Sequence, residues 1–177
     1  FYAREVKVAM SCFQEVVLSA SSEDENMHLW DLQTATTLVS YRPSSSATSS
    51  CVGLMGRDFF AVSQANKPLI QIFSWRKDQP HLRCVVPEKL VSIACCPSGA
   101  YIMGGGANGH LYLWEAASGA MLRSWDGHYR SVTVIAFTDD GSFAITASED
   151  SLVHAWSLGS LLDYATAHHE SPQASVT

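Results

Sequence analysis

Four aromatic residues recur at an almost constant interval and close four similar segments of the chain. They are Trp30, Phe73, Trp114 and Trp156, spaced 43, 41 and 42 residues apart. Each follows short runs of alternating apolar and polar residues that are separated by turn-forming residues. Periods of about 20 to 50 residues are typical of repeat architectures, and strands that formed independently would not keep such a period. We therefore predict an all-β chain of four repeated units.

The last unit shows the strand pattern most clearly. Residues 131–137 read SVTVIAF and are followed by Thr-Asp-Asp-Gly, in which Asp-Gly favours a tight turn between strands. Residues 142–148 and 152–156 are the next two expected strands. In the third unit the expected strands cover 90–95, 100–104, 110–114 and 121–125. In the second unit they cover 50–54, 59–63, 69–74 and 82–86. In the first unit they cover 6–10, 15–20, 27–31 and 37–41.

The polar residues of the last unit have a recognisable order. Gly127-His128 precedes its first strand, Asp150 lies in its second turn and Trp156 ends its third strand. This order resembles the structural tetrad of WD40 repeats, a hydrogen-bonded network of His, Ser or Thr, Asp and Trp. The resemblance implies a structural role for His128, Asp150 and Trp156, with Thr146 or Ser148 as the hydroxyl. A buried Asp needs donors, and an imidazole, a hydroxyl and an indole N–H supply them.

The other units keep the closing aromatic but depart from the tetrad. The first has the Trp30-Asp31 pair, whereas the third has Asn108 where Asp is expected before Trp114. Phe73 replaces Trp in the second unit. These departures predict fewer internal hydrogen bonds in the second and third units.

We expect a fragment of a WD40 β-propeller with about four four-stranded antiparallel blades, within a larger propeller of about seven blades. The expected blades cover 1–42, 49–86, 88–125 and 126–159. Residues 43–50 are rich in Ser and predict a loop between blades. Residues 160–177 lose the strand pattern and are expected to form a short helix or a disordered tail.

Composition restricts the classes of partner and ligand. The chain has 17 acidic and 11 basic residues, so its net charge of −6 favours contact with proteins over direct contact with nucleic acid. No apolar stretch is long enough for a membrane helix. The five cysteines have no metal-binding spacing, and His168-His169-Glu170 is a poor metal site, so we expect buried free thiols, no metal and no cofactor.

His128, Asp150 and Ser148 also superficially resemble a catalytic Ser-His-Asp set. The tetrad gives each of these residue types a buried structural role, and no element suited to an oxyanion hole accompanies them. We therefore expect a protein without enzymatic activity.

Four residues are candidates for partner contact. Tyr129 and Arg130 follow the Gly-His pair, where WD40 proteins often present partner-contacting side chains, and Tyr and Arg are enriched at binding hot spots. Arg76 and Lys77 form a small basic cluster after the second unit. An ordinary exposed loop remains an equally good interpretation of Tyr129 and Arg130.

Several stretches resemble one WD40 family in particular. They are Arg76-Lys77-Asp78-Gln79, the run from His128 to Val132, Phe137-Thr138 and the run from Leu152 to Leu158. They are similar to the family of WD-repeat protein eighteen and the fungal Ipi-three subunit. That resemblance implies a nuclear scaffold of the Rix complex, in the nucleolus and nucleoplasm, with the cytoplasm as a second location. It would bind ribosome-assembly subunits, including a helical-repeat scaffold, on the pre-ribosomal particle, and would support spacer removal from precursor ribosomal RNA without cleaving it.

A substrate receptor of a ubiquitin ligase, or another chromatin or signalling scaffold, is the alternative. WD40 receptors of such ligases often carry Arg two residues after Trp-Asp. Here Trp30-Asp31 is followed by Leu32-Gln33, and Trp156 by Ser157-Leu158. The ribosome-assembly scaffold is therefore the preferred hypothesis.

Overall fold

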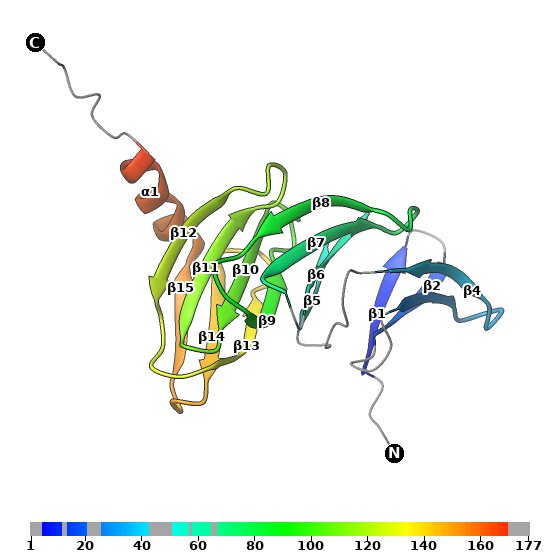
Figure 1. Ribbon diagram of the computed structural model, residues 1–177, viewed down its shortest axis with the longest axis horizontal. Coiled ribbons are helices and arrows are strands. Elements are labelled where there is room, and N and C mark those ends of the chain that lie inside the picture. Colours follow the sequence, from blue (N-terminus) through cyan, green and yellow to red (C-terminus); the bar gives the residue numbers. More distant parts are fainter. Residues whose placement is uncertain are drawn as a thin grey trace, which may run out of the picture.

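The computed structural model describes residues 5–11, 14–20, 26–42, 51–56, 58–64 and 67–169. These residues form four antiparallel sheets, stacked face to face in an open arc, and one helix (Figure 1). The sheets follow one another along the chain, and within each sheet every strand pairs with the next in sequence. The predicted all-β propeller architecture is thus confirmed.

The first three sheets have four strands each and the last has three. Sheet 1 contains β1 (Glu5–Ser11), β2 (Gln14–Ala20), β3 (Met27–Asp31) and β4 (Thr37–Tyr41). Sheet 2 contains β5 (Val52–Met55), β6 (Phe59–Ser63), β7 (Leu69–Ser74) and β8 (Pro80–Val85). Sheet 3 contains β9 (Leu90–Cys95), β10 (Tyr101–Gly106), β11 (His110–Glu115) and β12 (Met121–Asp126). Sheet 4 contains β13 (Val132–Phe137), β14 (Phe143–Ser148) and β15 (Val153–Ser157).

Equivalent turns join the first two strands of sheets 3 and 4. Gly99 and Gly141 have φ values of 74° and 71°, a region that side chains other than Gly rarely adopt. Their N–H groups donate to the carbonyl oxygens of Cys96 and Thr138, each at 2.8 Å. A glycine at these two positions therefore lets each hairpin close.

A second repeated feature lies beside the closing aromatic of each four-stranded sheet. The pairing of the third and fourth strands shifts register between Leu29 and Trp30, between Ile72 and Phe73, and between Leu113 and Trp114. Such shifts are typical of β-bulges, which bend a strand and increase its twist.

Sheet 4 departs from the expected four strands. After Ser157 the chain enters helix α1 (Leu158–His169), which starts before the residue 160 at which the tail was expected. Leu158 and Leu161 are buried and anchor the helix on the core between sheets 3 and 4. The rest of the expected tail and the Ser-rich loop at 43–50 lie outside the described residues.

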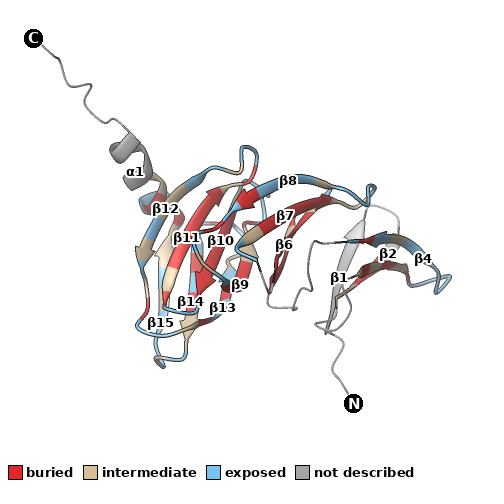
Figure 2. Ribbon diagram, viewed as in Figure 1, coloured by how far each residue is buried: buried red, intermediate tan, exposed pale blue. Residues whose placement is uncertain are grey.

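The core consists of three apolar layers between successive sheets. Phe73 packs with side chains of sheet 1, Trp114 with side chains of sheet 2, and Trp156 with side chains of sheet 3. Each of these aromatics therefore points toward the preceding sheet. Burial is concentrated in the central strands of sheets 2 and 3 (Figure 2).

The outward face of sheet 4 is different, because no described sheet packs against it. Val134, Phe143, Ile145 and Val153 lie on it and are 56, 46, 40 and 68% exposed. Exposed apolar patches of this kind are characteristic of interaction surfaces. In the described part of the chain, no helix is long and apolar enough to cross a membrane.

Candidate functional site

Four side chains of sheet 4 form one buried hydrogen-bonded network. His128 Nδ1 lies 3.0 Å from Asp150 Oδ2, and His128 Nε2 lies 2.8 Å from Thr146 Oγ1. The indole N–H of Trp156 donates to the same Thr146 hydroxyl at 2.9 Å. The network joins the loop before β13, the strands β14 and β15 and the turn between them. It therefore fixes both loops at one end of the sheet.

Asp150 is held as a carboxylate by several donors. It accepts hydrogen bonds from the backbone N–H groups of Tyr129 and Leu152, each at 2.9 Å. Burial by itself would raise the pKa of Asp150. The two backbone hydrogen bonds and the His128 imidazole outweigh this effect, so the pKa falls from 3.8 to about 2. Asp150 is therefore ionised at neutral pH.

The structure brings four of the five predicted tetrad residues together and leaves the fifth beside them. The hydroxyl of the network belongs to Thr146, whereas Ser148 Oγ donates to the carbonyl oxygen of Arg130 at 3.0 Å and accepts the N–H of Asp150 at 3.2 Å. The side chain of His128 is fully buried. With Ser148 directed at the backbone and His128 sealed from solvent, these residues do not form a nucleophile and a base open to a substrate.

The same contacts hold the loop that carries two candidate binding residues. Ser148 fixes the carbonyl of Arg130, Asp150 fixes the N–H of Tyr129, and the N–H of Glu149 donates to the carbonyl of Ser131 at 3.0 Å. The side chains remain free of the core: Tyr129 is 88% exposed and Arg130 is also exposed. A rigid backbone thus presents an aromatic ring and a guanidinium to solvent.

The described residues of sheet 1 show part of the same arrangement. The indole N–H of Trp30 donates to Ser19 Oγ at 2.9 Å, as Trp156 donates to Thr146. Asp31 is buried, and its carboxylate accepts the N–H of Gln33 at 2.8 Å.

Sheet 2 replaces the network by aromatic packing and an amide pair. Phe73 is fully buried, and its ring stacks on Phe60 with a centroid distance of 5.5 Å. Gln64 Nε2 donates to Gln71 Oε1, and both side chains are buried.

Sheet 3 contains a network that sequence reasoning missed. Glu88, in the loop before β9, accepts hydrogen bonds from the Tyr112 hydroxyl at 2.8 Å and from Asn108 Nδ2 at 3.1 Å. His110 lies between two carboxylates, with Nδ1 3.4 Å from Glu88 Oε1 and Nε2 2.7 Å from Asp126 Oδ1. This network differs from that of sheet 4: the acid comes from the loop and the donors come from the strand and turn. The indole N–H of Trp114 takes no part in it and has no acceptor among the described residues, in line with the weaker tetrad predicted for the third unit.

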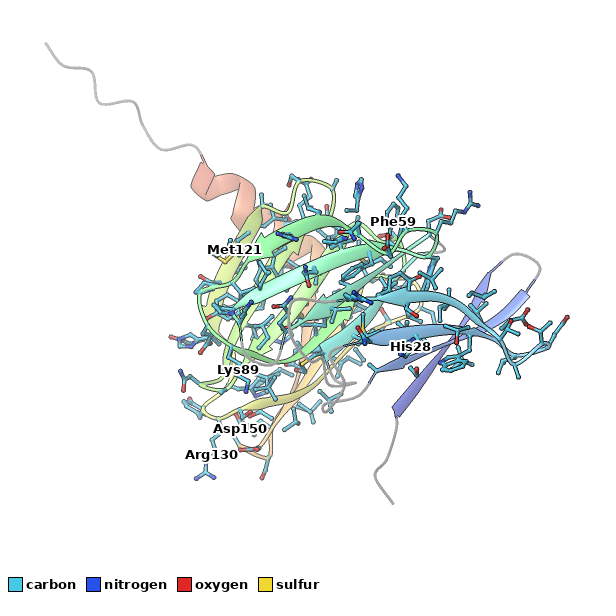
Figure 3. All side chains as sticks on the ribbon, turned by 45° about the vertical axis from the view of Figure 1, so that its right-hand side comes forward. His28, Phe59, Lys89, Met121, Arg130 and Asp150 are labelled. Atoms are coloured by element: carbon cyan, nitrogen blue, oxygen red, sulfur yellow. The ribbon has the colours of Figure 1, made fainter. Side chains whose placement is uncertain are left out.

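The two candidate binding pairs lie at opposite ends of the sheets. Arg130 and Asp150 lie at one end together with Lys89, whereas Phe59 lies at the other (Figure 3). Arg76 and Lys77 follow the end of β7, beside the start of β6 at Phe59, so they do not share a surface with Arg130. No group of three potential metal ligands occurs among the described residues.

Comparisons with known proteins agree with this architecture. The model of the WD40 family (WD domain, G-beta repeat) matches residues 119–157, which contain the whole His128 network. A computationally designed protein, Ika4, has the same fold with a TM-score of 0.71, covering 90% of this chain and 94% of Ika4, at 20% identity.

Several curated proteins are similar in sequence. Protein ROOT INITIATION DEFECTIVE 3 of Arabidopsis thaliana is 36% identical over 83% of this chain and 34% of its own length. Pre-rRNA-processing protein IPI3 of Mycosarcoma maydis is 43% identical over 64% of this chain and 19% of its own. WD repeat-containing protein 18 of Danio rerio is 30% identical over 93% of this chain and 38% of its own. The chain spans about a third of the length of most curated relatives it matches. Fold, network and sequence together place this chain among the WD40-repeat proteins, with similarity to WD repeat-containing protein 18 and the Ipi3 proteins.

Proposed function

We propose that this chain is the propeller part of a non-catalytic scaffold that acts in maturation of the large ribosomal subunit precursor. The observation that carries the proposal is its similarity, at 43% and 30% identity, to two fungal proteins named for pre-rRNA processing. The scaffold binds proteins of the pre-ribosomal particle, among them a helical-repeat subunit, and works in the nucleus. It needs no cofactor and cleaves no RNA itself.

The surface formed by Tyr129 and Arg130 is the proposed contact with a protein partner. Both side chains are exposed on a loop whose backbone is fixed by Asp150 and Ser148. A loop that is already ordered loses little conformational entropy on binding, and Tyr and Arg dominate many hot spots. The net charge of −6 supports contact through proteins and not through RNA phosphates.

The test uses the full-length protein in cells that lack the endogenous copy. Affinity purification and mass spectrometry should recover ribosome-assembly factors, and depletion should cause precursor RNA that retains an internal transcribed spacer to accumulate. The double substitution Tyr129→Ala and Arg130→Glu should reduce both partner recovery and rescue, whereas Met121→Ala, on an outer strand, should not. Recovery of cullin subunits in place of assembly factors would instead support a ubiquitin-ligase receptor.

A further inference from the structure

A groove of about 410 Å³ lies at the end of sheet 2 that carries Phe59, away from the Tyr129–Arg130 surface. It is formed by the start of β6, the end of β7 and the start of β8. The lining side chains are Phe59, Ser74, Lys77, Gln79, Pro80 and His81. Grooves of a few hundred Å³ have the size of sites that hold a small ligand or a few side chains of a peptide.

The turn that forms one wall is anchored from three directions. The N–H of Trp75 donates to the carbonyl of Asp58 at 3.1 Å, and the Tyr41 hydroxyl donates to the carbonyl of Trp75 at 2.9 Å. The Trp75 ring packs on Phe60 with a centroid distance of 4.6 Å. The groove is therefore ordered before any partner arrives, which lowers the entropic cost of binding.

The lining combines a lysine and an imidazole with apolar side chains. Among the described residues, Lys77 and His81 are the ionisable groups that line the groove, and no carboxylate does so. Phe59 and His81 form a tilted ring pair with centroids 5.5 Å apart, and Pro80 adds a further apolar surface. This local character contrasts with the net charge of −6 of the whole chain.

Two further cations, Arg76 and Arg83, lie close to the groove lining in the sequence. Arg76 and Arg83 are exposed on the same turn and on β8. Neither they nor Lys77 forms an ion pair with any residue in the part of the chain that the structure describes. Two exposed carboxylates, Asp58 before Phe59 and Asp78 on the turn, are close in sequence to lining residues, but neither lines the groove.

We propose that this groove binds an acidic peptide segment of a protein partner. An apolar side chain of the segment contacts Phe59 and Pro80, and its carboxylates contact Lys77 and His81. A peptide suits the groove better than RNA, because only two ionisable groups line it and the negative charge of the whole chain opposes approach of a polyanion. The site goes beyond the proposed function, since it adds a second surface at the opposite end of the sheets.

The test measures binding of labelled probes to the purified chain by fluorescence anisotropy. The first probe is a short peptide that alternates Glu and Leu, and its matched control has Lys in place of Glu. The acidic peptide should bind saturably, more tightly than the basic one, and more weakly as salt concentration rises. Lys77→Glu should weaken it about tenfold, because an attractive charge becomes repulsive.

Lys89→Glu is the matched control, since it makes the same charge change at the other end of the molecule. It should change the affinity less than about twofold. Amide resonances of residues 74–83 should shift when the acidic peptide is added, and those of residues 128–131 should not. Equal weakening by both variants, or shifts spread over both ends, would show a nonspecific charge effect and overturn the proposal.

A single-stranded oligouridine probe separates the peptide from a nucleic acid. If the RNA binds more tightly than the acidic peptide and depends on Lys77, the groove is a nucleic-acid surface and the proposal is wrong. If neither the acidic peptide nor the RNA binds, the proposal is also wrong. Melting temperatures of the two variants, compared with the wild type, verify that the fold is intact.

Discussion

Trp114 packs directly against Gly104, and its buried indole N–H has no hydrogen-bond acceptor among the described residues. In the next sheet, Trp156 donates to the Thr146 hydroxyl at 2.9 Å. Gly104 and Trp114 lie 42 residues before Thr146 and Trp156, so Gly stands where the acceptor would be. A Cβ atom at Gly104 would lie 2.9 Å from the Trp114 ring and 2.7 Å from Leu90, which leaves no room for that acceptor.

This difference predicts unequal effects of the same substitution at the two tryptophans. Trp156→Phe loses a hydrogen bond as well as volume, whereas Trp114→Phe loses volume and an unpaired donor. Trp156→Phe should therefore lower the free energy of unfolding by about 1 kcal/mol more than Trp114→Phe lowers it, relative to the cost of lost volume at each site. Urea unfolding measures both losses, and a larger loss at Trp114 after the volume cost at each site has been subtracted would contradict the assignment.

We predict that loss of the Thr146 hydroxyl from the His128 network destabilises the chain. Thr146→Val keeps the shape but leaves the buried indole N–H of Trp156 and the buried Nε2 of His128 without their partner, so it should cost about 1–3 kcal/mol. Thr133→Val is the matched control, because Thr133 is exposed and bonds only a backbone carbonyl. It should cost less than about 0.5 kcal/mol. Equal losses in the two variants would argue against a buried network.

Stability should fall at acidic pH through Asp150. Its pKa is lowered from 3.8 to about 2 in the folded chain, so the stabilisation is complete above the unfolded pKa and is lost as pH falls toward 2. Asp150→Asn should thus be less stable than the wild type at about pH 6, and the difference should shrink between about pH 4 and pH 2. Asp140, whose pKa is also about 2 because of hydrogen bonds from Ser142 and Thr138, should account for part of the remaining acid sensitivity. A difference that stays constant over this range would exclude the linkage.

The Glu88 network predicts how Tyr112 titrates at alkaline pH. Burial, followed by the hydrogen bond and charge of Glu88, raises the pKa of Tyr112 to about 12, whereas burial alone raises that of Tyr41 to about 12. Glu88→Gln should lower the pKa of Tyr112 and leave that of Tyr41 unchanged, as measured by NMR of ¹³C-labelled tyrosine. Because both pKa values exceed 10 in the folded state, the associated stability is present below pH 10 and is lost as pH rises toward 12. Equal shifts at both tyrosines would indicate a change of fold.

The strands and closing aromatics were predictable because their signals are local. Alternation of apolar residues and turns such as that at Gly141 act within a few neighbours, and the period of about 42 residues aligns the units. The Glu88 network was not predictable in this way. It joins Glu88 to Tyr112 across 24 positions. In sheet 3 the acid lies in the loop before the first strand, whereas in sheet 4 that loop carries His128 and the acid Asp150 lies in a turn. One signal was present: Glu88 stands 40 residues before His128, at the equivalent point of the preceding unit.

The helix that follows the third strand of sheet 4 was also not predictable from local signals. The pattern of sheet 4 resembled that of the other units as far as Trp156, and the choice between a fourth strand and α1 depends on packing of Leu158 and Leu161 against the core. Helix propensity and strand propensity over so few residues do not decide this, because tertiary contacts override them.

The outward face of sheet 4 predicts self-association of the isolated chain. Phe143, Ile145 and Val153 are each at least 40% exposed there, and they occupy the positions that meet the following sheet elsewhere in the stack. Contact between such faces removes apolar area from water and is favourable by about 25 cal/mol per Å² before association costs. Ile145→Lys should therefore shift sedimentation toward monomer, whereas Tyr129→Lys, equally exposed but on a loop, should not. A chain that is monomeric at high concentration would contradict the prediction, because the exposed face would then have no tendency to pair with another sheet.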